Sequence, residues 1–310
     1  MKIAVIGSGG VGGYFGAKLA KSENDVTFLT RGRHLEAMQQ HGLTVKSIKG
    51  DFKVDDVNAT DSITAIGKVD LILLGVKAWQ VKDIAGELLP LIKNDTMILP
   101  LQNGVIAAEE LQSVLNPSLV VGGSCRIICK IEAPGVINHF GVEPTIVLGE
   151  LDKSNSIRTE LLNKMFIQAG INTKLSNDIQ ADIWRKFIHI CVSGLMAVTR
   201  ATYGQLREVK ETRQLMLGLF TEVYQLSQKA GIAIESDFVD KTIAVMDGFS
   251  YDATTSLARD IWEGKPSELE YQNGTVVRLA DKYKLNVPIN KFVYDCLLPQ
   301  EIKARKSQHS

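Results

Sequence analysis

Short apolar runs alternate with helical patterns along the first third of the chain. Lys2 to Ile6 is apolar and β-branched enough for a buried strand, and Val11 to Lys21 suits a helix and contains no proline. The run Asp25 to Thr30 then completes a strand–helix–strand unit. Two further apolar runs, Val69 to Gly75 and Met97 to Leu101, are typical of parallel strands covered on both faces. The pattern predicts an α/β, Rossmann-like, doubly wound parallel sheet.

Shorter elements are expected between and after these runs. The pattern predicts a hairpin at Leu43–Lys46 with Phe52–Val54, a strand at Leu119–Gly123 and a group of glycine-punctuated hairpins at Cys125–Gly149. It then predicts a helix at Ile157–Ala169 and a last strand at Ile171–Leu175.

Strand patterns disappear after the triplet Ser176-Asn177-Asp178, which resembles a helix N-cap. The remainder reads as helices at Ile179–Thr199, Val209–Ala230, Phe238–Met246, Ser256–Trp262, Glu268–Tyr283 and Lys291–Ala304. We therefore predict a Rossmann-like domain over residues 1–177 and an all-α domain over residues 178–310.

Between the first strand and the first helix, the glycines fit the pattern G-x-G-x-x-G. Gly7 suits a sharp turn, Gly9 would let a pyrophosphate approach the backbone, and Gly12 would let the helix pack closely on the strand. The start of the helix would present free N–H groups to the phosphates. The candidate cofactor-binding turn is Gly7, Ser8, Gly9, Gly10, Val11 and Gly12.

The end of the second strand bears on the choice of cofactor. An NAD site would place a carboxylate there for the ribose 2′-hydroxyl, but this chain has Arg31, followed by Arg33 and His34. A guanidinium suits a 2′-phosphate through paired, charge-assisted hydrogen bonds. We predict NADPH as the cofactor, with an incidental surface arginine as the alternative.

Two more candidates lie just beyond predicted parallel strands. Lys77 follows the run that ends at Gly75, and Asn103 follows the run that begins at Met97. Ligands gather at the carboxyl ends of strands in open parallel sheets. Position therefore favours a functional role for both residues, although Asn103 before Gly104 also suits a simple turn.

The first helix of the second domain carries a polar stripe. Asp182, Lys186, His189 and Ser193 are spaced by four, three and four residues. A solvent-facing stripe on an amphipathic helix is one reading. Apolar neighbours flank the stripe closely, however, so Lys186 is also a candidate general acid.

Composition limits the classes of partner. The 310 residues contain 35 Lys and Arg against 35 Asp and Glu, so net charge gives no reason to expect nucleic acid or an anionic membrane. The four cysteines have no metal-binding spacing, and we expect them to be reduced. With no signal-like start and no apolar run near the ~20 residues that span a bilayer, a cytoplasmic protein with a small-molecule substrate is expected.

Together these segments resemble ketopantoate reductase, the NADPH-dependent 2-dehydropantoate 2-reductase of pantothenate biosynthesis. The resemblance rests on the glycine-rich turn with Arg31 and on segments in both predicted domains: Val76–Gln80, Gln102–Gly104, Trp184–Lys186, Ser256–Asp260 and Glu268–Gly274. It implies an active site in a cleft between the domains, a 2-oxo acid substrate and no metal, and it leaves a homodimer open.

The resemblance also implies roles for individual residues. Lys186 matches the catalytic lysine, Glu268 an acid of the second domain, Ser256 and Asn103 substrate contacts, and Lys77 a residue of the cofactor cleft. From its position after a strand alone, the amide of Asn103 would face the nicotinamide ribose or the substrate. Hydride delivery to a 2-oxo carbon leaves negative charge on oxygen, which an ammonium stabilises and protonates.

The chain departs from the family pattern one and two turns after the lysine. The well-described reductases carry asparagines there, in positions that resemble substrate contacts, whereas this chain has Ile190 and Gly194. A substrate hydroxyl left unpaired would cost about 1–3 kcal/mol. We hypothesise a changed pocket in which His189 or Ser193 compensates, so the particular 2-oxo acid stays open.

Two other functions fit the same sequence. A β-hydroxyacid dehydrogenase also joins a Rossmann domain to a helical domain around a lysine. A non-catalytic NADPH sensor would bind the cofactor without turning over any 2-oxo acid.

Overall fold

The computed structural model describes residues 1–307 and divides into two compact units. The first, here called the N-terminal unit, holds residues 1–102 and 106–182. The C-terminal unit holds Asn103–Val105 and the chain from Ile183 onward. The sequence-based boundary at residue 177 and this division at residue 182 lie close together in the chain.

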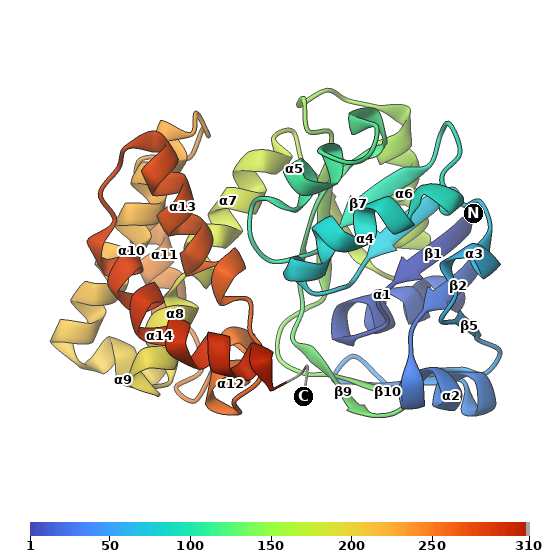
Figure 1. Cartoon of the computed structure of the whole chain (residues 1–310), viewed down its shortest axis with the longest axis horizontal. Helices are drawn as coiled ribbons and strands as arrows, with labels where there is room; N and C mark the ends of the chain where they lie inside the picture. The colour runs from blue at the N-terminus through green and yellow to red at the C-terminus, as the bar shows by residue number, and fades with distance from the viewer. Residues whose placement is uncertain (308–310) are drawn as a thin grey trace. The chain divides into compact units, whose positions relative to one another are not determined.

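A five-stranded parallel sheet forms the centre of the N-terminal unit (Figure 1). Its order is β5 (Asn58–Thr60), β2 (Asp25–Leu29), β1 (Lys2–Ile6), β6 (Leu71–Leu74) and β7 (Met97–Pro100). All four pairings are parallel. The sheet confirms the predicted parallel α/β architecture.

Helices and short 3-10 turns connect the strands of the N-terminal unit. The α-helices are α1 (Gly10–Ala20), α2 (Gly32–His41), α3 (Ile63–Ile66), α4 (Val81–Glu87), α5 (Ala107–Gln112) and α6 (Ile157–Gln168). The 3-10 turns are η1 (Ala78–Gln80), η2 (Leu89–Leu91) and η3 (Pro117–Leu119). The hydrophobic pattern did not predict α2, in which Met38 is the buried residue.

Two smaller sheets complete this unit. One has the order β4 (Phe52–Val54), β3 (Leu43–Ser47), β10 (Val136–His139) and β9 (Cys129–Ala133), and it contains the predicted hairpin as β3 and β4. The other has the order β12 (Asn172–Leu175), β11 (Thr145–Gly149) and β8 (Gly122–Arg126). The prediction of a strand from Leu119 was wrong at its start, because Asn116 caps the turn η3 and β8 begins only at Gly122.

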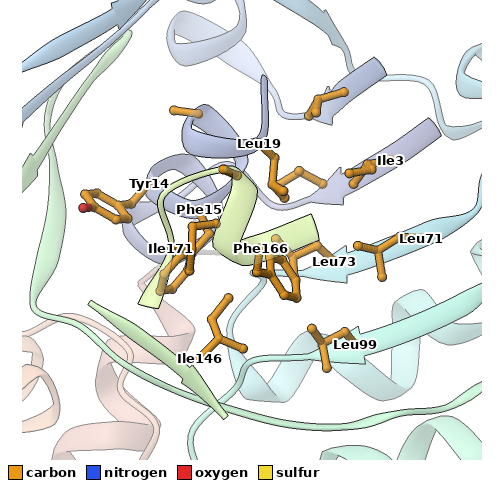
Figure 2. Packing of buried hydrophobic residues seen from close by; sticks show 14 of the residues in the cluster. Ile3, Tyr14, Phe15, Leu19, Leu71, Leu73, Leu99, Ile146, Phe166 and Ile171 are labelled. Atoms are coloured by element: carbon orange, nitrogen blue, oxygen red, sulfur yellow. The ribbon is translucent and has the colours of Figure 1, made fainter. Parts of the chain in front are cut away.

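The strands of the parallel sheet are apolar on both faces because both faces are covered. Ile3, Leu71 and Leu99 pack on one face with the aromatic rings of Phe15 and Phe166, as Figure 2 shows. The residues between them on each strand belong to a second buried cluster that includes Ala4, Ile6, Ile72, Leu74 and Ile98. This two-sided burial explains the near-continuous apolar runs of the sequence.

The regular elements described from Ile179 to Lys306 are all helical. They are α7 (Ile179–Ile190), α8 (Val192–Thr199), α9 (Tyr203–Glu208), α10 (Lys210–Lys229), α11 (Phe238–Asp247), α12 (Ser256–Trp262), η4 (Leu269–Tyr271), α13 (Asn273–Tyr283) and α14 (Pro288–Lys306). The predicted all-helical second half is thereby confirmed. Within residues 1–307, no helix is both long and apolar enough to cross a bilayer.

The predicted helices differ from the observed ones in four places. The helix expected over Ile179–Thr199 is interrupted at Cys191 and forms α7 and α8. Residues Glu268–Tyr283 form a 3-10 turn and a shorter helix rather than one helix, and α9 was not predicted. Helix α14 starts earlier than expected, with Pro288 in its first turn, where a missing N–H costs nothing.

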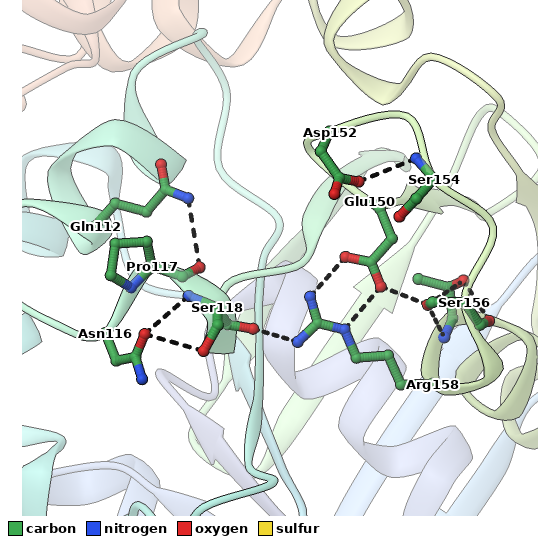
Figure 3. Close-up of polar contacts among 10 residues, drawn as sticks. Gln112, Asn116, Pro117, Ser118, Glu150, Asp152, Ser154, Ser156 and Arg158 are labelled. Atoms are coloured by element: carbon green, nitrogen blue, oxygen red, sulfur yellow. Dashed lines mark hydrogen bonds and ion pairs between the residues drawn. The ribbon is translucent and has the colours of Figure 1, made fainter.

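An ion pair with a buried carboxylate fixes the end of β11 to α6 in the N-terminal unit. Arg158 donates from Nε and Nη2 to the two carboxylate oxygens of Glu150, at 2.7 and 2.5 Å. Its third nitrogen donates to the carbonyl oxygen of Ser118, and the hydroxyl of Ser156 donates to Glu150 (Figure 3). The pKa of Glu150 is lowered chiefly by its hydrogen bonds from Arg158.

Removal of this guanidinium should destabilise the N-terminal unit. Arg158→Met leaves the buried carboxylate of Glu150 without its cationic partner, and we expect the free energy of unfolding to fall by about 2 kcal/mol at neutral pH. The lowered pKa of Glu150 means that the pair stabilises the fold above the ordinary carboxyl pKa of 4.5 and loses that effect as the pH falls. The difference between wild type and variant should therefore shrink at acidic pH, which urea unfolding at several pH values measures.

The matched control is Arg213→Met, which removes an ion pair with Asp247 whose side chains are 39% and 42% exposed. An exposed pair contributes about 1 kcal/mol or less. Equal losses in the two variants would contradict the special role of Arg158.

Candidate active site

Glycine is required at two positions of the turn that follows β1. Gly7 has a φ of +91°, and a Cβ atom there would lie 2.8 Å from the backbone nitrogen of Val76. A Cβ atom on Gly12 would lie 2.1 Å from the carbonyl oxygen of Gly7. The lack of a side chain at Gly7 permits the sharp turn, and the lack of one at Gly12 permits α1 to approach β1, as the G-x-G-x-x-G pattern predicts.

The middle of the turn offers room and polar groups for a phosphate. A Cβ atom on Gly9 would meet no atom within 4 Å, so the backbone there is accessible. The hydroxyl oxygen of Ser8 is buried and has no hydrogen-bond partner among the described residues. Gly9 is the N-cap residue of α1 and has no side chain to cap it, which leaves the first N–H groups of the helix for a ligand. These features fit the pyrophosphate of a dinucleotide.

Arg31 and Lys77 are both exposed and both follow parallel strands. Arg31 lies two residues after β2, at the N-cap of α2 in an extended backbone conformation. Lys77 lies three residues after β6, and its ammonium is 5.7 Å from the centre of the Trp79 ring. The backbone N–H of Lys77 donates to the side-chain oxygen of Gln80 at 3.1 Å. Both cations are thus at the carboxyl edge of the parallel sheet.

Gln102 is a residue of this edge that sequence reasoning missed. Its amide nitrogen donates to the carbonyl oxygens of Leu74 and Val76, both at 3.0 Å, and so ties the end of β7 to the end of β6. Its amide oxygen is buried and has no hydrogen-bond partner among the described residues. The available signal was a polar residue directly after a buried strand.

Asn103 and Glu268 meet inside the C-terminal unit. The amide nitrogen of Asn103 donates to Oε2 of Glu268 at 2.9 Å, across 165 positions of the chain. Gly104 has a φ of +97°, and a Cβ atom there would lie 2.7 Å from the carbonyl oxygen of Tyr271. The close approach at Gly104 lets Asn103 reach Glu268. Glu268 is buried, with only 5% of its surface exposed.

The segment before Glu268 is fixed by a buried ion pair of α14. The carboxylate of Glu301 accepts hydrogen bonds from the backbone N–H and the hydroxyl of Ser267, the latter at 2.6 Å. Arg305 pairs with Glu301 at 2.7 Å and donates to the carbonyl oxygen of Ser267 at 2.9 Å. The sequence predicted a helix over Lys291–Ala304 but gave no sign that Glu301 and Arg305 hold Ser267.

Lys186 lies half-buried on α7, one turn before Ile190. The other members of the predicted polar stripe have different surroundings. Asp182 accepts a hydrogen bond from the Ser176 hydroxyl at 2.6 Å, and the ring of His189 stacks edge to face with Phe238 at 5.5 Å. Ser193 lies beyond the helix break and is buried. The solvent-facing stripe considered from the sequence is therefore wrong for Ser193, which is only 2% exposed.

Ser256 is the exposed first residue of α12. The helix is capped by Thr255, whose hydroxyl accepts from the backbone N–H of Ala258 at 3.3 Å. Capping therefore does not account for the serine.

Gly194 of α8 lies against the side chain of Asn273 in α13. A Cβ atom on Gly194 would lie 2.4 Å from Oδ1 of Asn273 and 2.5 Å from a methyl carbon of Val293. The amide nitrogen of Asn273 donates to the carbonyl oxygen of Cys191 and to Oδ1 of Asn290, both at 3.0 Å. A side chain as large as asparagine therefore has no space at position 194, because Asn273 and Val293 occupy it.

A parallel sheet with a glycine-rich turn, followed by a helical unit that carries a half-buried lysine, is an arrangement that fits the class of dinucleotide-dependent oxidoreductases. Comparison with known families narrows this class. Residues 3–153 match the family described as ketopantoate reductase PanE/ApbA, and residues 178–301 match the C-terminal part of the same family. The chain belongs to the ketopantoate reductase family, whose members carry out NAD(P)-dependent reduction of 2-oxo acids.

Individual relatives agree with this assignment. The chain is 31% identical to a 2-dehydropantoate 2-reductase of Nostoc over 93% of this chain and 91% of the relative. It is 27% identical to the uncharacterized oxidoreductase YkpB of Bacillus subtilis, over 95% and 97% of the two chains. A 2-dehydropantoate 2-reductase structure from Geobacter metallireducens has a TM-score of 0.90 at 30% identity and covers 96% of this chain and 99% of that one.

A structure of D-mandelate dehydrogenase with NADH and anilino(oxo)acetate shares the fold. It has a TM-score of 0.89 at 22% identity and covers 98% of this chain and 99% of that one.

The close contact at Gly194 leads to a prediction about stability. Gly194→Ala should lower the free energy of unfolding by about 1–2 kcal/mol, because the new methyl group would displace an Asn273 side chain that two hydrogen bonds hold in place. Urea unfolding measures the change.

Gly248→Ala is the matched control, since its Cβ would lie 3.5 Å from its nearest neighbour, the carbonyl oxygen of Val245. A stability of Gly194→Ala equal to that of the control would contradict the proposed packing.

Proposed function

We propose that the protein reduces a small 2-oxo acid, 2-dehydropantoate or a relative, to the 2-hydroxy acid with NADPH. The hydrogen bond between Asn103 and Glu268 is the observation that supports this best. It brings two of the polar residues expected to hold the substrate to one place in a unit that also carries Lys186.

Each unit would supply a different part of the chemistry. In the N-terminal unit, the turn from Gly7 to Gly12 would bind the pyrophosphate and Arg31 the 2′-phosphate. Lys77 and Asn103 would contact the cofactor as well. When bound, NADPH supplies the hydride to the 2-oxo carbon.

Lys186 would donate the proton. As hydride reaches the carbon, negative charge grows on the former carbonyl oxygen, and an ammonium beside that oxygen stabilises the charge and protonates it. Glu268, whose carboxylate already accepts from Asn103, would accept a hydrogen bond from the substrate, and Ser256 would contact the substrate through its exposed hydroxyl. These steps leave a 2-hydroxy acid and NADP⁺.

Replacement of the proposed proton donor gives the main test. Lys186→Ala should fold and bind NADPH like the wild type but lose roughly 10²–10⁴-fold in turnover, the usual contribution of a general acid. Cofactor oxidation followed by absorbance with a panel of branched, linear and hydroxylated 2-oxo acids provides the measurement.

Lys229→Ala is a suitable control because Lys229 is an exposed lysine at the end of α10. Unchanged turnover in Lys186→Ala would reject the assignment. Tight NADPH binding by the wild type without turnover of any acid in the panel would instead favour a sensor.

The same panel addresses the substrate. Ketopantoate and the same acid without its terminal hydroxyl group differ by one hydrogen-bonding group. Ile190 is apolar and Gly194 has no side chain, so we expect the form without the hydroxyl to be reduced at least as efficiently. A strong preference for ketopantoate would mean that another residue pairs with its hydroxyl.

The cofactor preference depends on Arg31. Arg31→Ala should raise the KM for NADPH by roughly tenfold or more and leave the KM for NADH nearly unchanged, because only NADPH carries the 2′-phosphate. Steady-state kinetics with both cofactors give this ratio, and Arg31→Lys tests whether charge without paired hydrogen bonds is sufficient. Equal effects on both cofactors would exclude a 2′-phosphate role.

A further inference from the structure

His34 connects the glycine-rich turn to another turn of the N-terminal unit. It lies half-buried on α2, and its Nε2 is 3.1 Å from the carbonyl oxygen of Ser8. The backbone N–H of Gly135 donates to its Nδ1 at 3.0 Å. Gly135 belongs to the turn between β9 and β10, which lies beside α2 in Figure 1.

These two contacts determine the protonation state of the ring. Since a backbone N–H donates to Nδ1, that nitrogen carries the lone pair, and the single ring proton is on Nε2. Nε2–H then donates to the Ser8 carbonyl. Burial lowers the pKa of His34, which agrees with a neutral imidazole.

The hydrogen bond to Ser8 also orients the next peptide N–H. The carbonyl of Ser8 and the N–H of Gly9 belong to one planar trans peptide, in which these two groups point in opposite directions. A carbonyl directed toward His34 therefore directs the N–H of Gly9 away from α2. A Cβ atom on Gly9 would meet nothing within 4 Å, so the turn leaves room for a ligand at this residue.

The other turn that His34 contacts is itself well fixed. Gly135 has a φ of +72°, and a Cβ atom there would lie 3.1 Å from the side chain of Ala37 on α2. Strand β9 also touches the glycine-rich turn, since a Cβ atom on Gly10 would lie 2.8 Å from the carbonyl oxygen of Cys129. The glycine-rich turn is thus held by α2 and by β9 together.

We propose that His34 is a positioning residue for the cofactor, which holds the Ser8–Gly9 peptide in the orientation that presents the Gly9 N–H to a phosphate. This role rests on the proposed binding of NADPH at the glycine-rich turn. It acts through the Ser8 carbonyl and not through contact with the reacting atoms. Substitution should therefore change cofactor affinity and leave the chemical step unchanged.

Two amide substitutions separate the two contacts of His34. In His34→Gln, the amide nitrogen of the new side chain reaches the position of Nε2 and retains the donor to Ser8. In His34→Asn, the shorter side chain places its oxygen near the position of Nδ1 and retains only the acceptor for Gly135. Each amide variant thus tests one contact at a time, and His34→Ala removes both.

The experiment titrates the full chain of each variant with NADPH and follows the fluorescence of the bound cofactor. We expect His34→Ala and His34→Asn to weaken binding by roughly three- to tenfold, the usual effect of one lost hydrogen bond, and His34→Gln to bind within about twofold of the wild type. Turnover at saturating NADPH should stay within about twofold of the wild type in all three variants.

Several outcomes would overturn the proposal. Unchanged affinity in His34→Ala would do so, and so would equal weakening in His34→Gln and His34→Asn, which would indicate that the ring acts only through packing. If His34→Ala does not fold, the difference in NADPH affinity between His34→Gln and His34→Asn still tests whether the hydrogen bond to Ser8 matters. A wild type that binds neither NADPH nor NADH would also overturn it.

The result is separable from the proposed reductase activity. A wild type that binds NADPH but reduces no 2-oxo acid would reject the reductase and leave the affinity series of His34 interpretable. A wild type that reduces a 2-oxo acid while His34→Ala retains full affinity would reject only the role of His34.

Discussion

The close approach of α1 to the centre of the parallel sheet is the constraint on which the N-terminal unit depends. A Cβ atom on Gly12 would lie 2.1 Å from the carbonyl oxygen of Gly7, and one on Gly75 would lie 2.7 Å from the same oxygen. Gly7 after β1, Gly75 after β6 and Gly12 in α1 therefore pack against one another, and a side chain at Gly12 or Gly75 would clash. This contact places the start of α1 at the carboxyl edge of the sheet, where its free N–H groups can serve a phosphate.

The C-terminal unit places its candidate residues largely through buried polar contacts, in addition to the close approach at Gly104. Ser267 is held through its N–H, hydroxyl and carbonyl groups by Glu301 and Arg305 of α14. Glu268 follows directly and accepts from Asn103. Buried polar groups are costly unless they are satisfied, so such a network favours one arrangement of the segment over its alternatives.

A second buried polar network lies at the break between α7 and α8. Asn273 donates to the carbonyl oxygen of Cys191 at the break and is itself held by Asn290. Asn290 in turn donates to the carboxylate of Glu222 at 2.8 Å. Asn273 of this network and Val293 occupy the space that a side chain at position 194 would need, so the packing at this point favours glycine.

The sequence by itself determined the parallel sheet, the helical second half and the location of Arg31, Lys77 and Asn103 just beyond strands, because hydrophobic period and glycine spacing are local properties of the chain. Three features came from the three-dimensional packing: His34 reaches Ser8, Asn103 meets Glu268, and the helix after Asp178 breaks at Cys191. Those contacts join residues far apart in the chain, and their partners follow from packing rather than from any periodicity that a single sequence displays.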